Sequence, residues 1–425
     1  MKYIQRTKNT ITQNFLGNIL IERNLLPDNN IDKMAFFNPT WNNLLDYQLL
    51  DNIETAADMI EKHIKLGNRI YVVVDCDVDG YTSSSILYDY LIKNYKSIYP
   101  KFTLEYHIPT GKEHGLEALM PDLTEKKKYD LIILPDAGSN DFEEHRILKE
   151  LGYDICCLDH HIVEHPSEHA IVVNNQASER YSNKMLSGVG VVYQLLRCFD
   201  KRNNWDSANY YLDIVALGLI SDMMEMTTLE NRFICDYGLS HINNGFFKEM
   251  IEKQAFSLGD GPLTQMGVAF YITPLINALI RVGTQTDKEK LFIAFLNPDE
   301  IVPSTKRGEK GKAERISTQV ARNCVNAKAR QKREMDKAAE LLKIQISNDC
   351  LDDNKILILS ADELDIPRTL TGLCAMKIVS EYKKPVLLGR TNSNGEFKGS
   401  IRCDGNSELK DFKSFLLSSN LMDFV

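Results

Sequence analysis

Carboxylate side chains recur at the ends of short apolar runs in this sequence. The runs lead into Asp75-Cys76-Asp77-Val78-Asp79-Gly80, Asp136-Ala137-Gly138-Ser139 and Asp159-His160-His161. A fourth candidate, Asp222, interrupts the apolar helical pattern Leu217-Gly218-Leu219-Ile220-Ser221. A mixed set of aspartate and histidine suits a divalent ion of hard-to-borderline character, with Mn²⁺ preferred and Mg²⁺ as the alternative. The combination therefore indicates a candidate metal centre.

The number of possible ligands favours two ions over one. In parallel α/β sheets, ligands bind beyond the carboxyl ends of strands, so the three sets would meet in one crevice. Carboxylates gathered there repel one another unless cations neutralise them. Two ions about 3.5–4 Å apart, bridged best by Asp136, would use such a set and would activate a water molecule. The reaction that we expect is metal-assisted hydrolysis of a phosphoester.

Each motif taken alone has a simpler interpretation. A single aspartate at a strand end is usually a helix cap or a turn former. The pattern from Asp75 to Gly80 also resembles the start of a calcium-binding loop, but the twelfth position, which requires Glu, is Ile86. A histidine pair by itself is seldom a ligand pair. The metal centre is preferred because coincidence at three successive strand ends is improbable.

The elements that would position these residues follow from the hydrophobic pattern. Short β-branched runs at 69–75, 130–136, 154–159 and 170–174 predict strands that are buried on both faces. Helical patterns lie between them, including one with Thr82 as its N-cap. This alternation predicts an α/β fold with an open parallel sheet and helices on both faces.

A second, smaller α/β domain is expected after Asn354. Its pattern gives strands at 355–359, 385–388 and 397–402 and a helix at 370–382. Between the two domains, residues 301–345 contain 12 Lys or Arg and 5 Asp or Glu. The part at 303–312 is expected to be an exposed loop, and the part that follows to be a helix.

The basic stretch has two interpretations. A solvated helix face that links two domains is the default. A positive wall that follows a phosphate backbone is the alternative, and long nucleic-acid strands would require it whereas a dinucleotide would not. This is the reason for preferring a polynucleotide as the substrate.

Composition sets limits on the class of protein. The 425 residues carry a net charge of -9, which excludes a generally basic protein that coats nucleic acid through its whole surface. Nine cysteines without a pattern fit a reducing compartment. No signal peptide is apparent, and the apolar stretch at 266–282 is too short for a membrane span and contains Pro274 and Arg281. We expect a cytoplasmic protein that does not associate with membranes.

Four blocks of the sequence carry a resemblance to a known family. DCDVDG, PDAGSND, LDHHIVEHP and ALGLISDMM, in this order and spacing, resemble the motifs of the DHH phosphoesterases, and most closely those of the RecJ-like single-strand-specific exonucleases. The stretches at 108–116, 186–191, 230–232 and 274–281 agree with that branch. Segments at 371–373, 385–387 and 399–402 resemble its accessory domain, called DHHA1. The resemblance covers residues 40 to about 415.

The resemblance implies roles for individual residues. Metal ligands are expected at Asp77, Asp79, Asp136, His160 and Asp222, with Asp75 as a further member of the set. Catalytic roles fall to Asp136, His160, His161 and Asp159: His161 contacts the scissile phosphate, and Asp159 orients a histidine.

Substrate phosphates are expected to meet a second set of side chains, where a bidentate Arg is the suitable donor. These are His161, Asn277, Arg281, Ser400 and Arg402. For Asn277 and Arg281, the alternative interpretation is a polar edge on a buried helix.

The resemblance also implies a division of the chain, in which a long helix joins a parallel-sheet DHH domain to a smaller DHHA1-like α/β domain. The expected segments are a helical lead-in at 1–65, the DHH catalytic domain at 66–245, a helical extension at 246–305, a basic connecting helix at 306–345 and a DHHA1-like substrate-binding domain at 346–425.

Three positions depart from the pattern of the branch. Leu275 and Ile280 stand where an Arg and a Gly are usual, and Cys403 replaces the last serine of GSxRS. The GGH motif that usually completes the accessory domain has no counterpart before Val425, so either the domain is shortened or the motif lies outside this chain. These departures bear on the binding of a terminal nucleotide more than on the metal chemistry.

The predicted function is that of a hydrolase of ester bonds. We expect an exonuclease that removes nucleotides from an end of single-stranded DNA, in the 5′-to-3′ direction by resemblance, during DNA repair or recombination. The alternatives are a DHH phosphodiesterase of nanoRNA or cyclic dinucleotides and a non-catalytic RecJ-like replication or repair scaffold. A helicase or a single-strand-binding protein is a candidate partner of a monomeric enzyme, and the compact chain fits a phage-encoded version.

Overall fold

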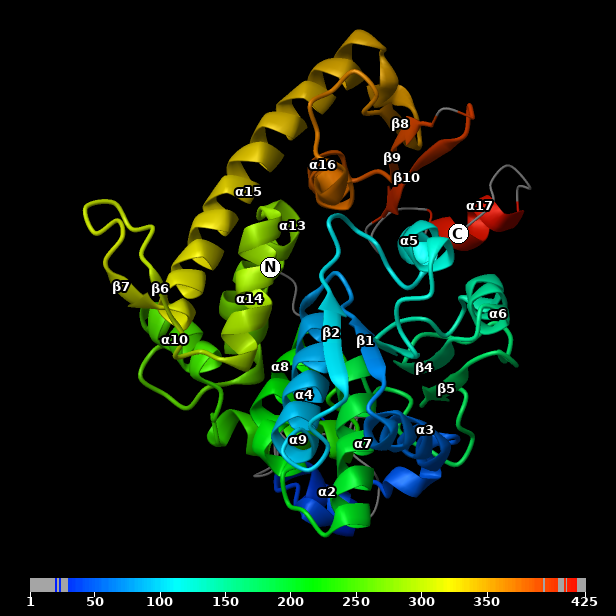
Figure 1. Cartoon of the computed structure of the whole chain (residues 1–425). Coiled ribbons are helices and arrows are strands. Elements are labelled where there is room, and N and C mark those ends of the chain that lie inside the picture. The colour runs from blue at the N-terminus through cyan, green and yellow to red at the C-terminus, as the bar shows by residue number, and fades with distance from the viewer. Residues whose placement is uncertain are drawn as a thin grey trace. The chain divides into compact units, whose positions relative to one another are not determined.

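The computed structural model describes residues 30–392, 394–403 and 411–418, together with Leu20, Arg23 and Leu409. Contacts divide the chain into unit 1, Met1–Asn277 with Gln285–Arg322, and unit 2, Ala278–Thr284 with Asn323–Val425. The boundary crosses two helices, α13 (Thr273–Val282) and α15 (Ile316–Asn348) (Figure 1). Most of the expected lead-in before residue 30 lies outside the described residues, and the expected division into five segments stays a prediction.

Unit 1 is built on a parallel sheet of five strands in the order β2-β1-β3-β4-β5 (Figure 1). The strands are β1 (Arg69–Val73), β2 (Thr103–His107), β3 (Leu131–Pro135), β4 (Asp154–Asp159) and β5 (Ile171–Asn174). The predicted α/β fold with a parallel sheet is confirmed. The edge strand β2 was not predicted.

Helices cover both faces of this sheet, because successive side chains of a buried strand point to opposite faces. On one face, Ile132 and Leu134 of β3 pack with Leu123 of α5 (Met120–Glu125) and Leu148 of α6 (Phe142–Glu150). The other face is covered by α4 (Val78–Tyr95) and α7 (Gly188–Asn203), and α8 (Leu212–Ser221) packs against both of these helices.

The rest of unit 1 is mainly helical. Its remaining helices are α2 (Asn30–Phe37), α3 (Ile53–Leu66), α9 (Leu229–Ser240), α10 (Gly245–Lys253), α11 (Ala255–Leu258), α12 (Gln265–Gly267) and α14 (Gln285–Leu296). The exposed loop predicted at 303–312 is confirmed for residues 304–312, and it joins two strands that were not predicted, β6 (Ile301–Pro303) and β7 (Ala313–Arg315), in an antiparallel hairpin. Strands of three residues are too short to leave an alternating pattern in the sequence.

One apolar run passes a length and composition test for a membrane span. It comprises Gln265–Val282, with a mean hydropathy of 1.2 and 44% of its residues buried. This run is one residue longer than the stretch 266–282, which was predicted to be too short for a membrane span. It consists of α12, the π-helix η5 (Val268–Ile272) and α13. The core helix of a soluble protein passes the same test, so this is weak evidence, and the expected absence of membrane association stays a prediction.

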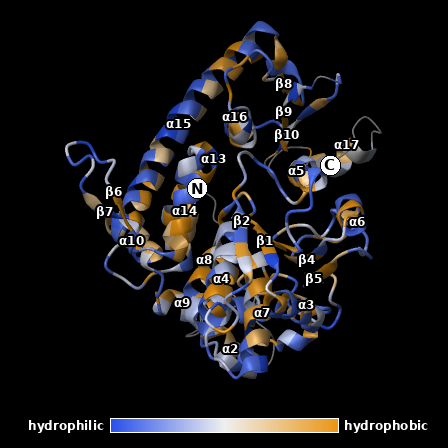
Figure 2. Cartoon of the chain, viewed as in Figure 1, coloured by the Kyte–Doolittle hydropathy of each residue, from blue (hydrophilic) through white to orange (hydrophobic). Residues whose placement is uncertain are grey.

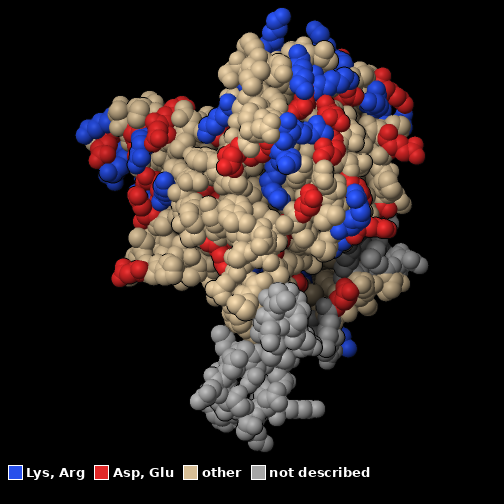
Figure 3. Space-filling view, turned by 90° about the horizontal axis from the view of Figure 1, so that it is seen from below, with Lys and Arg blue, Asp and Glu red and all other residues tan. Residues whose placement is uncertain are grey.

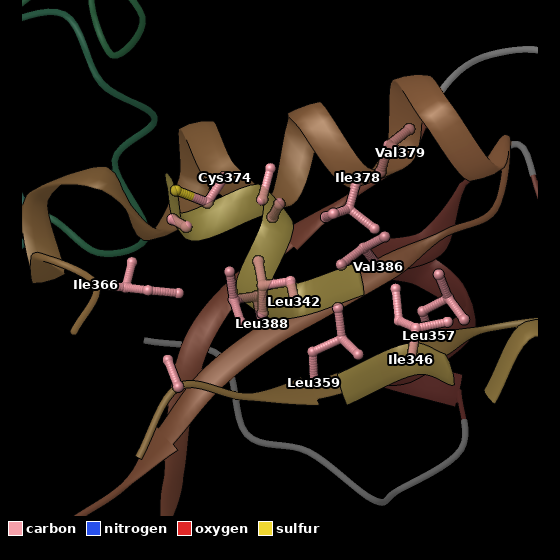
Figure 4. Close-up of a cluster of buried hydrophobic side chains, with 14 of the residues drawn as sticks. Leu342, Ile346, Leu357, Leu359, Ile366, Cys374, Ile378, Val379, Val386 and Leu388 are labelled. Atoms are coloured by element: carbon pink, nitrogen blue, oxygen red, sulfur yellow. The ribbon is translucent and has the colours of Figure 1, made fainter. Parts of the chain in front are cut away.

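Unit 2 contains a mixed sheet of three strands in the order β10-β9-β8. Strand β8 (Leu357–Ser360) is parallel to β9 (Val386–Thr391), and β10 (Phe397–Arg402) is antiparallel to β9. Helix α16 (Thr371–Tyr382) and the second half of α15 share a core with this sheet, in which Leu342, Ile378 and Leu388 are buried (Figure 4). The predicted smaller α/β domain is confirmed. A short helix, α17 (Phe412–Ser418), follows.

Hydrophilic and hydrophobic residues alternate along helix α15 (Figure 2), and charged side chains of both signs lie on the molecular surface (Figure 3). Figure 2 shows α15 as an alternation of hydrophilic and hydrophobic residues, as expected of a helix that packs along one side. On the face drawn in Figure 3, Lys and Arg side chains are interspersed with Asp and Glu side chains.

Candidate metal centre

The carboxyl ends of β1, β3 and β4 bring the predicted ligands together in unit 1. Three groups of side chains each place one donor atom per residue within 4.8 Å of the others. The groups are Asp75, Asp77 and Asp136; Asp79, His160 and Asp222; and Asp136, His160 and His161. Because Asp136 and His160 each belong to two groups, the three groups form one continuous cluster.

The first motif serves as a helix cap as well as a source of ligands. Asp77 is the N-cap of α4, and its Oδ1 accepts a hydrogen bond from the backbone N–H of Gly80 at 3.1 Å. The prediction of Thr82 as the N-cap is wrong, because the helix already begins at Val78 and the Thr82 hydroxyl donates to the carbonyl of Asp79. A Cβ at Gly80 would lie 2.4 Å from the Cβ of Asp75, so only glycine lets α4 approach this closely.

Asp79 joins α4 to the start of α7. Its carboxylate accepts hydrogen bonds from Ser187 Oγ at 3.1 Å and from the backbone N–H groups of Gly188 at 2.7 Å and Val189 at 3.2 Å. These N–H groups have no partner within their own helix, and the helix dipole favours a negative charge there. Burial, and then the nearby Asp222, nevertheless raise the pKa of Asp79 well above its ordinary value.

Asp136 lies at the centre of the cluster with an unsatisfied oxygen. Its Oδ1 is buried and has no hydrogen-bond partner, although His160 Nε2 lies 3.2 Å away without the alignment of a hydrogen bond. Its backbone has a φ of 66°, a left-handed conformation that costs about 1–2 kcal/mol for a residue other than glycine. Burial, and then Asp79 and Asp77, raise its pKa well above the ordinary value. A bound cation would satisfy this oxygen and remove the repulsion.

His160 is in the protonation state that a metal ligand requires. Its Nε2 lies 3.2 Å from Asp136 Oδ1 and 3.4 Å from Asp222 Oδ2. Burial lowers its pKa to about 4, so the imidazole is neutral at pH 7. Burial, and then Asp77, raise the pKa of Asp222 to about 6. The donor set thus fits a divalent ion in chemical type and in arrangement.

Asp159 orients His161. Its Oδ1 accepts hydrogen bonds from the backbone N–H of His160 at 2.7 Å and from Nδ1 of His161 at 2.7 Å, and its Oδ2 accepts from the backbone N–H of Ser139 at 3.0 Å. Burial alone would raise the pKa of Asp159, but the hydrogen bond from His161 and the others hold it well below its ordinary value. The same bond raises the pKa of His161. Asp159 therefore stays ionised and fixes the His161 ring.

Sequence reasoning missed His114 as a member of this site. It follows β2, and its Nδ1 lies 2.6 Å from Oδ1 of Asp75, while its ring packs edge-on against His161 at 5.0 Å between centroids. The hydrogen bond to Asp75 raises its pKa to about 9. Asp141 Oδ2 accepts a hydrogen bond from the backbone N–H of Leu116 at 2.8 Å and so holds this loop in place. The only signal in the sequence was the agreement of 108–116 with the family pattern.

The expected substrate contacts fall in both units. In unit 2, Ser400 and Arg402 lie on β10, beside the first turn of α16, where a Cβ at Gly372 would be 2.8 Å from Arg402 Nη2 and 3.4 Å from Ser400 Oγ. The start of a helix is a favourable place for an anion. Arg281 is also in unit 2. Burial of Lys328 lowers the pKa of that side chain, and the nearby positive charge of Arg281 lowers it further. Asn277 belongs to unit 1, and its side-chain oxygen is buried without a hydrogen-bond partner.

Comparisons with known proteins bear on the identity of this fold and site. The profile described as DHH family, N-terminal domain, matches residues 69–219. A candidate SPbeta prophage-derived single-strand DNA-specific exonuclease, YorK of Bacillus subtilis (strain 168), is 41% identical over 400 residues, which are 93% of this chain and 67% of that protein. Single-stranded-DNA-specific exonuclease RecJ of the same strain is 26% identical over 88% of this chain and 44% of its own length.

Solved structures agree in fold. A crystal structure of exonuclease RecJ bound to manganese has a TM-score of 0.66 and 23% identity, covering 84% of this chain and 83% of the other. RecJ from Thermus thermophilus in complex with Mn²⁺ has a TM-score of 0.63 and 23% identity, covering 84% of this chain and 48% of the other. The family match, the YorK relative and this shared fold agree with the motifs gathered at the sheet edge. The chain belongs to the DHH family, in its branch of RecJ-like single-strand-DNA-specific exonucleases.

Proposed function

We propose that this chain is a metal-dependent exonuclease that removes nucleotides from an end of single-stranded DNA. The observation that carries the proposal is the buried Asp136 oxygen, which has no hydrogen-bond partner and lies among groups of carboxylate and imidazole donors. The names of the YorK and RecJ relatives support single-stranded DNA as the substrate. The manganese in the two RecJ crystal structures supports the type of ion.

Two divalent ions, preferably Mn²⁺ with Mg²⁺ as the alternative, would share this cluster. Asp77 and Asp136, with Asp75, would hold one ion, and Asp79, His160 and Asp222 would hold the other. Asp136, which groups with Asp75 and Asp77 and also with His160, would be the carboxylate best placed to serve both ions. When bound, such a pair supplies Lewis-acid activation of water and neutralises charge that develops on a phosphate.

The protein's own residues then position the substrate. His161 donates a hydrogen bond from Nδ1 to Asp159, which would leave Nε2 available to contact the scissile phosphate. Because the pKa of His161 is raised, the ring is more readily protonated and can donate from Nε2 to a phosphate oxygen. In unit 2, Ser400, Arg402 and Arg281 supply donors for further phosphates, and Asn277 of unit 1 is an additional amide donor. The resemblance to the RecJ branch supports release from the 5′ end.

The experiment that tests this function is digestion of end-labelled single strands. With Mn²⁺, the wild-type protein is expected to release the 5′ label first and to leave duplex of the same sequence uncut. Asp136→Asn is expected to lower the rate by at least about 10³-fold, because losing a ligand shared by both ions removes several kcal/mol of transition-state stabilisation. Asp122→Asn, an exposed carboxylate of α5, is the matched control and should have no effect.

Two results would reject the exonuclease proposal. Wild-type protein that hydrolyses no single strand with Mn²⁺, or an Asp136→Asn variant as active as the wild type, rejects the proposal. Faster release from a dinucleotide than from a long strand would point to the phosphodiesterase instead.

We also propose that the enzyme is a cytoplasmic monomer whose partner is a helicase or a single-strand-binding protein. Co-sedimentation with such a protein on a single strand tests the partner.

A further inference from the structure

The structure separates the basic stretch at 301–345 into two parts with different properties. Along α15, several cations already have acceptors within their own unit. Arg322 pairs with Glu314, Arg330 donates to the backbone carbonyl of Val282, and Lys343 lies 2.7 Å from Glu381. The helix therefore offers less free positive charge to a nucleic acid than its composition indicates.

The turn of the β6–β7 hairpin has a different character. This turn, residues 306–312, is called the basic tip, and it carries Lys306, Arg307, Lys310 and Lys312 beside one acidic residue, Glu309. All four cations are exposed. Within the described residues, the ion pairs of the tip amount to one, between Lys306 and Glu309 at 3.0 Å. The basic tip thus presents a net charge of +3 to solvent.

Backbone hydrogen bonds hold the basic tip in one conformation. The N–H of Ser304 donates to the carbonyl of Lys312 at 2.8 Å, and the N–H of Gly311 donates to the carbonyl of Ser304 at 2.9 Å. Gly308 and Gly311 have φ angles of 83° and 85°, which other residues rarely adopt. An ordered loop gives up little conformational entropy when it binds a partner.

The composition of the tip indicates the chemistry of that partner. Residues 304–312 contain no aromatic and no aliphatic side chain. Protein interfaces depend on buried aromatic or apolar anchors, and stacking on bases depends on aromatic rings. Lysine and arginine on a polar loop are instead the usual contacts to phosphate oxygens, without regard to sequence.

We propose that the basic tip binds the phosphate backbone of the nucleic-acid substrate at nucleotides remote from the bond that is cut. In unit 1, α10 and α14 lie between the hairpin and the sheet that carries the metal centre (Figure 1). On this proposal a long strand occupies both sites, whereas a short one occupies only the metal centre. This inference rests on the proposed function, because it takes the substrate to be a nucleic acid.

Salt-dependent binding tests the inference. The tip variant is Lys306→Ser, Lys310→Ser and Lys312→Ser together, and the matched control replaces the three exposed lysines Lys126, Lys127 and Lys128 by Ser. Affinity is measured with chelator present for long and short single strands and for a long duplex. For the long strand, the tip variant should reduce the slope of log K against log salt by about 2, which is about 100-fold in affinity at 0.1 M salt. The control should match the wild type.

The arms of the experiment identify the source of the phosphates and separate the two proposals. A loss confined to the long single strand supports substrate binding, and a loss confined to the duplex moves the contact to double-stranded DNA. An unchanged slope on both overturns the inference. The exonuclease proposal is read separately from Mn²⁺-dependent hydrolysis of the short strand: if this hydrolysis is absent while the tip still sets the salt slope, only the proposed function fails.

Discussion

Replacing Gly188 by alanine would test the metal centre without removing any of its donors. Gly188 is the first residue of α7, directly after the N-cap Ser187. A Cβ there would lie 2.3 Å from Asp136 Oδ1 and 2.6 Å from Asp136 Cβ, whereas ordinary contacts begin at 3.4 Å. The two residues must therefore separate by about 1 Å, and such a displacement of a catalytic group costs about 100-fold in rate. We expect Gly188→Ala to lose about 100-fold in hydrolysis and to bind Mn²⁺ more weakly.

A second glycine of the same helix turn provides the control. A Cβ at Gly190 would be as crowded, at 2.4 Å, but its neighbour is the Leu186 side chain and not a ligand. Gly190→Ala should lose about 1–3 kcal/mol of stability through overpacking and keep its activity below the melting temperature.

The assay pairs single-turnover release from an end-labelled strand with the electron paramagnetic resonance signal of free Mn²⁺, recorded across a Mn²⁺ titration. Thermal melting of both variants separates a displaced ligand from a damaged fold. Wild-type rate and wild-type Mn²⁺ affinity in Gly188→Ala would refute the reasoning, because the buried Asp136 carboxylate would then not be a ligand.

Three further predictions concern the ions, His114 and a buried histidine. Chelation should lower the free energy of unfolding by about 2.7 kcal/mol relative to protein in Mn²⁺ at about 100 times its dissociation constant, whereas Asp136→Asn should melt at nearly the same temperature with and without Mn²⁺. His114→Phe should weaken Mn²⁺ binding by about 10-fold, because it loses the hydrogen bond to Asp75. His114→Asn can still donate to Asp75 and should weaken Mn²⁺ binding less. Equal Mn²⁺ affinities for the wild type and both variants would contradict this prediction. Burial lowers the pKa of His145 to about 4, below its unfolded value of about 6.5, so its contribution to stability is complete above pH 6.5 and is lost as the pH falls towards 4. Denaturant unfolding should show that the wild type loses about 2 kcal/mol more than His145→Gln between pH 7 and pH 5, and parallel losses would reject this assignment.

The parts of the fold that could be predicted from the sequence are those in which an uninterrupted run of apolar residues indicates a buried strand. Strands β1, β3 and β4 are largely buried, so each lies in an apolar run that leads to an acidic residue. Parallel strands bring their carboxyl ends to one edge, and this is sufficient to gather Asp75, Asp136 and Asp159. The register of the strands and the orientation of the side chains were not needed for that inference.

Other features depend on contacts that a single sequence does not encode locally. Strand β2 lies at an edge of the sheet with its first and third residues exposed, so Thr103–His107 has no continuous apolar pattern. Because this strand was not predicted, the position of the His114 loop that follows it could not be predicted either. The N-cap of α4 was misplaced because both Asp77 and Thr82 are good capping residues, and packing of Gly80 on Asp75 decides between them. The approach of Arg402 to Gly372 depends on the pairing of β10 with β9.

The most direct test of the central claim is a crystal structure of the chain grown with Mn²⁺ and recorded at the manganese absorption edge. We predict two anomalous peaks about 3.5–4 Å apart, with Asp136 contacting both and His160 and Asp222 contacting one. A map with no anomalous peak within ligand distance of Asp136 would contradict the two-ion site.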